Sequence, residues 1–226
     1  MVSRIDRKKV VDTALRLLNE VGLDGLTLRG IAKELNVQAP ALYWHFKNKQ
    51  ELLDEMATEM TRRMTGSPEG GGPGMGAYDG TWQETLLDSC RRVRRELLGY
   101  RDGAKVFSGT RMTDGTVAAE ALDFLMSCLT GAGFTLDEAA QAWWTAYNFT
   151  VAVVIEEQSV HPVPGQREIR DPAYDLSERE RQLGPDFPLA AQAGQVMFGD
   201  LERSFEAGLR IIVAGIEAGS GSEARG

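Results

Sequence analysis

The chain has 226 residues, enough to bury a sizeable core as one large domain or two small ones. Hydrophobic residues make up 42% and charged residues 26%, as in an ordinary globular protein, while the net charge of −8 argues at first against a nucleic-acid binder. That charge is uneven: residues 1–65 carry 11 Lys and Arg against 9 Asp and Glu, and the remainder carries 14 against 24. A mildly basic first segment and an acidic remainder indicate two different roles.

The first segment places hydrophobic side chains at helical spacing. The pattern predicts a first helix over 7–21 that ends at Gly22. Thr27 is suited to cap a second helix over 28–35, and Asn36 tolerates the positive φ of a tight turn.

Two more helices are predicted before residue 65. Pro40 fits the first position of a third helix over 40–46, where its missing N–H costs nothing. Asn48, followed three residues later by Glu51, forms a capping-box-like start for a fourth helix that runs to about Met64.

Composition changes at residues 66–80, where 15 positions hold seven Gly and two Pro, so we expect a flexible linker or loop. Helical spacing resumes at Trp82, and further helices are predicted at about 115–131, 136–157 and 200–218. Residues 161–188 hold five Pro and many charges and are expected to form a long loop with room for a short helix. Almost nothing alternates with period two, so the prediction is an all-α chain with domains at 1–65 and 81–226.

Several features indicate a cytoplasmic protein. The charged N-terminus lacks an apolar signal segment, and the apolar stretch 139–155 is interrupted by polar residues, so a buried helix is preferred to a membrane span. Cys90 and Cys128 cannot form a disulfide framework and are interpreted as small buried hydrophobes.

The helices over 28–35 and 40–46, with their four-residue link, have the dimensions of a helix-turn-helix, whose second helix enters a major groove of DNA. Leu42 and Phe46, four residues apart, are expected to be core. Tyr43, Trp44 and His45 are expected to face DNA, where their polar atoms donate to phosphates and their rings pack on sugars and methyl groups. Lys49 and the helix start beside it suit another phosphate.

Residues 10–56 resemble the DNA-binding head of the tetracycline-repressor (TetR) family in two strings, "GLDGLTLRGIAKELNV" and "LYWHFKNKQELL". The resemblance implies that Arg29 reads a base and that Pro40, Tyr43, Trp44, His45 and Lys49 contact DNA. Gln38, Ala39 and Ala41 also occupy recognition positions, but here they depart from the tetracycline-binding members, as does Leu28. Because the alanines offer only methyl contacts, Gln38 is the main direct reader of that group and the operator should differ from the tetracycline one.

The strings "YRDGAKVFSGTR" (100–111) and "NFTVAVVIEEQ" (148–158) resemble the family's C-terminal body. The fold implied is an N-terminal three-helix helix-turn-helix domain plus a larger helical ligand-binding and dimerisation domain. The implied partners are double-stranded operator DNA, a small-molecule effector and a second copy of the chain, with no membrane and no cofactor. The residues alone leave open whether 139–155 and 200–219 are core or interface, and the resemblance favours a four-helix dimer interface. The apolar stripe offered for that interface is Leu201, Phe205, Leu209, Ile212 and Ile216, with Gly208 and Gly215 allowing close approach.

The resemblance also implies an effector pocket for a planar, largely apolar ligand. Trp143 and Trp144 point 100° apart on a helix, so we expect that they do not serve one core face. A magnesium–tetracycline chelate is not expected, because Phe107 replaces a histidine ligand, Ser89 replaces an asparagine that holds the drug, and Glu156 alone is a poor metal site. The residues assigned to the pocket are Trp82, Ser89, Val93, Phe107, Thr110, Arg111, Trp143, Trp144, Tyr147, Asn148, Phe149 and Glu156.

The sequence favours a repressor that leaves its operator when an effector binds. A ligand-independent regulator or an activator with the same DNA-binding mode remains the alternative. An enzyme is disfavoured, because His45 and His161 have no nucleophile nearby in sequence and the glycines at 70–76 do not form a phosphate loop. No residue reports the effector, the operator sequence or the regulated gene.

Overall fold

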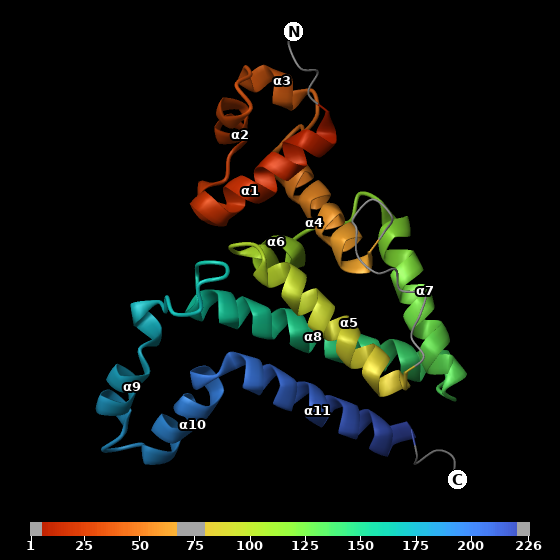
Figure 1. Ribbon diagram of the computed structural model, residues 1–226, viewed down its shortest axis with the longest axis vertical. Helices are drawn as coiled ribbons and strands as arrows, with labels where there is room; N and C mark the ends of the chain where they lie inside the picture. Colours follow the sequence, from red (N-terminus) through yellow and green to blue (C-terminus); the bar gives the residue numbers. More distant parts are fainter. Residues whose placement is uncertain (1–5, 67–79, 221–226) are drawn as a thin grey trace. The chain divides into compact units, whose positions relative to one another are not determined.

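The computed structural model describes residues 6–66 and 80–220, and over these residues it contains helices and no strand, which confirms the all-α prediction (Figure 1). Most of the predicted linker at 66–80 lies outside the described residues. The elements are α1 (Arg7–Gly25), α2 (Leu28–Glu34), α3 (Ala39–Tyr43), α4 (Lys49–Thr65), α5 (Trp82–Leu98), α6 (Gly103–Ser108), α7 (Gly115–Gly131), α8 (Leu136–Val160), the 3-10 helix η1 (Pro172–Tyr174), α9 (Leu176–Leu183), α10 (Pro188–Gly199) and α11 (Leu201–Ser220).

The chain divides into two compact units. The first contains the head, α1–α4, together with residues 92–124; the second contains residues 79–91 and 125–226. The helices α5 and α7 therefore contribute to both units.

Local capping explains where the helices of the head begin. The Thr27 hydroxyl accepts a hydrogen bond from Gly30 N, and Asn48 Oδ1 accepts one from Glu51 N at 2.9 Å. The Glu51 carboxylate accepts from Lys47 N at 2.8 Å, one residue before the position in a standard capping box. Asn36 has φ 53°, as predicted for its turn.

Three helix boundaries differ from the predictions. Gly22, at φ 69°, bends α1 but does not end it, and the helix resumes to Gly25. Pro40 is the second residue of α3 rather than the first, and α3 ends at Tyr43 because Phe46 N and His45 N both turn back to Leu42 O. The short helix α6 was not predicted.

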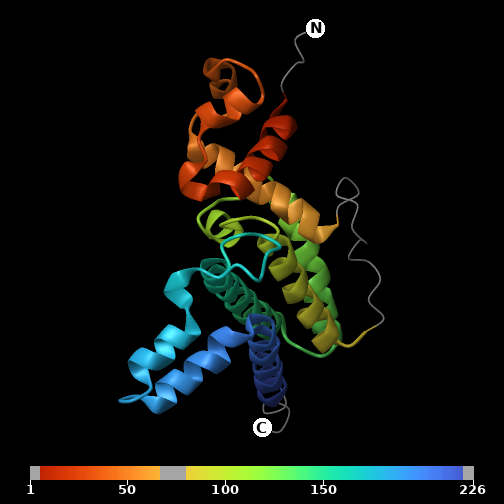
Figure 2. The same ribbon diagram turned by 60° about the vertical axis from the view of Figure 1, so that its left-hand side comes forward.

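The prediction for 161–188 allowed a short helix within a loop, and the structure places η1 and the eight-residue α9 there, joined by loops. Asp171 caps η1 and Asp175 caps α9 by accepting backbone N–H groups. Pro172 and Pro188 occupy first turns of η1 and α10, where proline starts a helix instead of breaking it. Figure 2 shows α9 and α10 lying side by side in the second unit, as does Figure 1.

The core of the second unit forms where α5, α8 and α11 meet. Its buried centre is made of Leu86, Cys90, Ala146, Phe205 and Leu209. Burial raises the pKa of the Cys90 thiol to about 11, so this cysteine is a small core residue, as predicted, while Cys128 is half-buried.

The apolar stripe of α11 faces this core, which corrects its assignment to a dimer surface. Phe205 and Leu209 are buried, and Ile212 and Ile216 pack against the same cluster. Gly208 allows a close approach within the chain, because a Cβ there would lie 2.2 Å from Phe149 Cζ. The physical reason is that α5 and α8 of the same chain cover the most hydrophobic face of α11. A different face of α11 remains exposed.

Candidate nucleic-acid interface and effector residues

The second helix of the helix-turn-helix is fixed by its inward side. Leu42 and Phe46 are fully buried against the head's core, to which α2 contributes Leu28, Ile31 and Ala32. The turn between the helices is closed by hydrogen bonds from Asn36 N to Lys33 O and from Val37 N to Ala32 O. The opposite side of α3 is thereby left free of the core.

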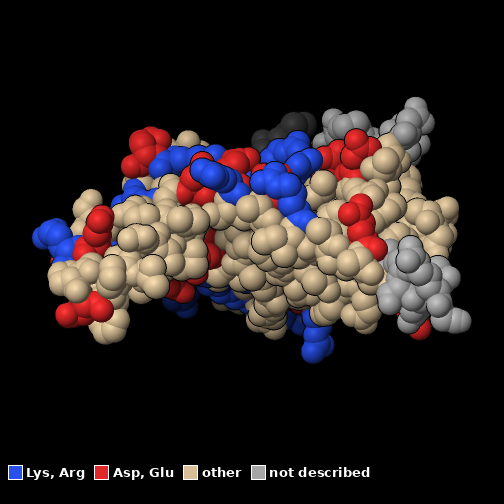
Figure 3. Space-filling model, turned by 90° about the horizontal axis from the view of Figure 1, so that it is seen from below, with Lys and Arg blue, Asp and Glu red and all other residues tan. Residues whose placement is uncertain are grey.

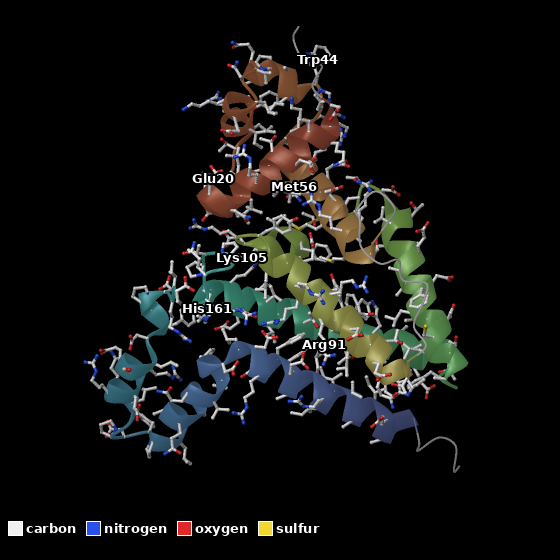
Figure 4. The ribbon with its side chains drawn as sticks, in the orientation of Figure 1. Glu20, Trp44, Met56, Arg91, Lys105 and His161 are labelled. Carbon is white, nitrogen blue, oxygen red and sulfur yellow. The ribbon has the colours of Figure 1, made fainter. Side chains whose placement is uncertain are left out.

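The rings that follow α3 lie on the outside of the head, as predicted. Trp44 is 88% exposed and Tyr43 48% exposed, whereas His45 is half-buried. In Figure 4 Trp44 lies at the outer end of the head, and Met56, on α4, lies further in. The exposure of an indole and a phenol beside a fully buried Phe46 is unusual for a monomer surface and is typical of a binding surface.

Most of the remaining predicted DNA contacts lie on α2, on α3 or directly before α3. The Arg29 side chain is exposed and has no partner among the described residues. Gln38 precedes α3, and its side chain makes no capping hydrogen bond. Pro40 is exposed, and Ala39 and Ala41 are half-exposed. The structure therefore brings the predicted set together on one head.

Lys49 has a second role that its sequence position does not reveal. Its amine donates to the Leu23 carbonyl at 2.6 Å, so it joins the start of α4 to the last turn of α1. Local patterns carry no signal for this contact, because the two residues are 26 positions apart. An ammonium has three donors, so the contact leaves capacity for a phosphate.

Four of the predicted effector residues belong to the first unit. Val93 and Phe107 are buried. The Thr110 hydroxyl donates to Phe107 O at 2.9 Å, and the Arg111 side chain is exposed while its backbone N–H donates to Asp54.

The other predicted effector residues belong to the second unit, where most of their rings are clustered. Trp82 meets Phe134 edge-on at 5.0 Å, and Trp143 lies 5.4 Å from Tyr147. Trp143 packs on the core whereas Trp144 is 60% exposed, so the prediction that they serve different faces is confirmed. Phe149 stacks on Phe205.

The polar members of the second-unit set are engaged locally or exposed. The Ser89 hydroxyl donates to Thr85 O and the Asn148 amide donates to Trp144 O. Glu156 is exposed while its neighbour Glu157 is buried. Burial raises the pKa of Tyr147, so its hydroxyl stays neutral and able to donate at physiological pH. Over residues 6–66 and 80–220, no three acidic, histidine or cysteine side chains are grouped to hold a metal ion.

Sequence reasoning missed a network that binds residues 99–114 to the head. Asp102, at φ 56°, accepts from Leu23 N at 3.0 Å. Asn19 accepts from Arg101 N at 2.8 Å. On α4, Thr58 Oγ1 accepts from Thr113 N at 2.9 Å.

Charge and hydrogen bonding keep Asp102 ionised. Burial alone would raise its pKa, but the Leu23 N–H and the Lys105 ammonium at 3.0 Å outweigh burial and hold the pKa of Asp102 below its usual value. The carboxylate is therefore a fixed negative anchor for the end of α1. Its positive φ in a non-glycine residue is the local feature that marks it.

None of the helices in the described ranges is long and apolar enough to cross a membrane.

Two family models match the chain. Residues 10–56 match the model described as bacterial regulatory proteins, tetR family, and residues 76–219 match the tetracyclin repressor-like C-terminal domain. The tetracycline repressor protein class A from transposon 1721 of Escherichia coli is 37% identical over 215 residues, which cover 95% of this chain and 92% of that protein.

Solved structures of TetR family proteins are also similar to the chain. A possible TetR family transcriptional regulator from Streptomyces coelicolor A3(2) is 37% identical, with a TM-score of 0.80 over 94% of this chain and 99% of that one. The Streptomyces coelicolor TetR family protein ActR, solved in complex with actinorhodin, is 27% identical, with a TM-score of 0.77 over 97% of this chain and 100% of that one.

Proposed function

Since the chain belongs to the TetR family of bacterial regulatory proteins, we propose that it is a ligand-responsive transcriptional repressor. It binds a near-palindromic operator as a homodimer and leaves the operator when a small molecule binds its C-terminal part. The observation that carries this proposal concerns the recognition helix α3 and the turn after it. There Leu42 and Phe46 are buried, while Tyr43 and Trp44 are exposed. We propose no catalytic role and a cytoplasmic location.

DNA recognition follows from the chemistry of the head. Arg29 has unpaired guanidinium donors suited to the O6 and N7 atoms of a guanine, and Gln38 can read an adenine. Ala39 and Ala41 select a thymine methyl group at most. Two heads of one dimer would read half-sites about 34–36 Å apart. The proposed boundary between the DNA-binding head and the C-terminal body lies at residues 66–80.

The effector class is a planar, largely apolar molecule. Its proposed contacts in the second unit are the rings of Trp82, Trp143 and Tyr147, with Ser89 and Asn148 as polar contacts. ActR, which shares 27% identity with this chain, was solved in complex with actinorhodin, which supports a small-molecule effector for this chain.

Magnesium–tetracycline is the obvious alternative because a tetracycline repressor is 37% identical to the chain. Phe107 and Ser89 lack the metal-binding and amide groups expected of that site. Titration of intrinsic tryptophan fluorescence with magnesium–tetracycline should show no saturable quenching at micromolar concentration. Saturable micromolar quenching would overturn this exclusion.

The coupling between effector and operator is proposed to run through residues 99–114. This segment is bonded to α4 by Gln50, which donates to Gly109 O at 3.2 Å, and by Thr58. It is bonded to the end of α1 by Asp102. A ligand that favours one position of this segment would turn the head, and by linkage operator DNA would weaken ligand binding equally.

Selection of bound fragments from genomic DNA tests the proposal, and release from the selected site then identifies the effector. Arg29→Ala should lower affinity for that site by about 10- to 100-fold while affinity for a scrambled duplex changes little. Lys49→Ala should weaken both duplexes alike, because it removes a phosphate contact. Equal loss of specificity in both variants would contradict the assignment of Arg29 as the base reader.

A further inference from the structure

A pocket of about 490 Å³ lies in the second unit between η1, α9 and the end of α10. Its volume is within the range of small-molecule sites. None of its lining residues belongs to the DNA-contacting set or to the effector set. It is therefore a separate candidate site on the same chain.

Apolar side chains form about half of the pocket wall. Tyr174 and Phe198 meet edge-on with ring centroids 6.5 Å apart, and Leu176 and Leu183 also line it. The Arg170 guanidinium donates to Tyr174 O at 3.2 Å and to Phe198 O at 2.7 Å, so it ties η1 to the end of α10. The two rings are held in place without a ligand.

Arg179 supplies an unsatisfied donor. Its side chain lines the pocket, and its Nε atom is buried with no hydrogen-bond partner in the part of the chain that the structure describes. A buried donor left without an acceptor is destabilising, so an acceptor bound beside Arg179 would relieve that cost. Gly194 of α10 makes room for this group, because a Cβ there would lie 2.5 Å from Arg179 Nε.

The charges around the pocket favour an anion at Arg179. Two carboxylates also line it, but both are compensated within α9. Asp175 accepts from Glu178 N at 2.7 Å as the helix cap. Glu178 is paired with Arg181 and accepts from the Gln182 amide at 2.6 Å. Among the described lining residues, Arg179 is the cation, and it has no ion pair; Asp175 has none either, but its carboxylate accepts the cap hydrogen bond.

We propose that this pocket binds a small amphipathic monocarboxylate, such as an aryl-substituted or medium-chain acid. The carboxylate pairs with the Arg179 guanidinium, and the apolar body packs against Tyr174, Phe198 and the two leucines. The neighbouring carboxylates disfavour a multiply charged anion such as a phosphate. The site is independent of the proposed effector site, since it shares no residue with it.

The test is calorimetric titration of the full-length protein with 4-phenylbutyrate, its neutral amide 4-phenylbutyramide, and inorganic phosphate. The acid should bind. The amide should bind at least about tenfold more weakly, because it loses the charged hydrogen bond to Arg179. Phosphate should also bind at least about tenfold more weakly, because it lacks an apolar body and carries more charge. Hydrogen exchange should show protection by the acid within residues 172–199. Protection confined to α5 and α8, or equal binding of acid and amide, would overturn the proposal.

Three substitutions localise the effect. Arg179→Gln should weaken the acid by about 10- to 100-fold. Arg203→Gln, the same change at an exposed arginine of α11 outside the pocket, should leave affinity unchanged. Gly194→Ala should also weaken the acid, because its Cβ displaces the guanidinium. Since removing an unpaired donor does not unfold the protein, Arg179→Gln should keep its thermal midpoint, and unchanged acid affinity in this folded variant would refute the role of Arg179.

Discussion

At the scale of single residues, neighbouring side chains divide between the core and the outer surface. Phe46 is fully buried and has the Arg7 guanidinium 4.4 Å from its ring centre. Trp44, two residues earlier, is exposed on the head's outer face. The turn after α3 makes this possible, because it redirects the chain between the two residues.

This division predicts opposite effects of truncation. Phe46→Ala should destabilise the fold by about 3–5 kcal/mol through the lost burial and the cavity left behind. Trp44→Ala should change stability by less than about 0.5 kcal/mol but weaken operator binding. Urea unfolding followed by circular dichroism, and fluorescence anisotropy with a labelled operator, measure the two properties. A Trp44→Ala protein with full operator affinity would contradict the proposed contact.

Asp102 predicts a pH dependence. Its pKa in the folded chain is below the ordinary value of about 3.9, so its stabilising effect is complete above that value and is lost as pH falls through the folded pKa. Asp102→Asn should therefore destabilise the protein by about 1–3 kcal/mol at pH 7. The difference in thermal midpoint between the two proteins should shrink below about pH 4. A difference that stays constant down to pH 3 would show that the Asp102 charge contributes nothing.

At the scale of elements, α4 is joined to the segment that follows α6 by side-chain to backbone hydrogen bonds. Thr58 is buried, and its hydroxyl accepts from Thr113 N and lies 3.0 Å from Thr113 Oγ1. These bonds are specific and few, so they can be exchanged during a switch. Packing alone would give a less defined connection.

Thr58→Val tests this connection while keeping the shape of the side chain. Exchange of the Thr113 amide should accelerate by about three- to tenfold, because the valine cannot accept its hydrogen bond. Thr65→Val is the matched control on the same helix, since the Thr65 hydroxyl bonds only to Arg62 O among the described contacts. Hydrogen exchange followed by mass spectrometry resolves the segment. Equal acceleration in both variants would assign the effect to α4 as a whole.

At the scale of the whole molecule, assembly depends on surfaces that the folded chain leaves exposed. Figure 3 looks onto the chain from the side of α11, and uncharged residues form a broad expanse in the middle of that view. Ile211 of α11 is 73% exposed and has Ala214 and Gly215 exposed nearby. On α8, Trp144 is exposed beside Ala140. We propose that the exposed faces around Ile211 of α11 and Trp144 of α8 form the dimer surface, instead of the buried stripe of α11.

Ile211→Asp should therefore shift the protein to a monomer and lower operator affinity, because one head reads only half a site. Leu122→Asp, at a 45% exposed leucine of α7, should leave the dimer intact. Sedimentation velocity over a range of concentrations measures the assembly. Dimers of unchanged stability in Ile211→Asp would exclude this face of α11 from the interface.

The sequence by itself determined the helical class, the helix-turn-helix and the inward and outward residues of its second helix. Those features depend on spacing, caps and turn residues within a few positions, such as Thr27, Asn36 and Asn48, and local rules describe them well. It also predicted that Trp143 and Trp144 serve different faces, because helical geometry alone requires it.

Only the tertiary structure decided which of several apolar faces each long helix buries. The stripe of α11 was misassigned because burial depends on what packs nearby. The position of the short helix within 161–188 was not predicted, because proline can begin a helix as well as interrupt one. The contacts of Lys49 with Leu23, of Asp102 with the end of α1, and of Arg179 with Gly194 join residues far apart in the chain. No local pattern encodes such pairs, because they exist only once the chain has brought them together.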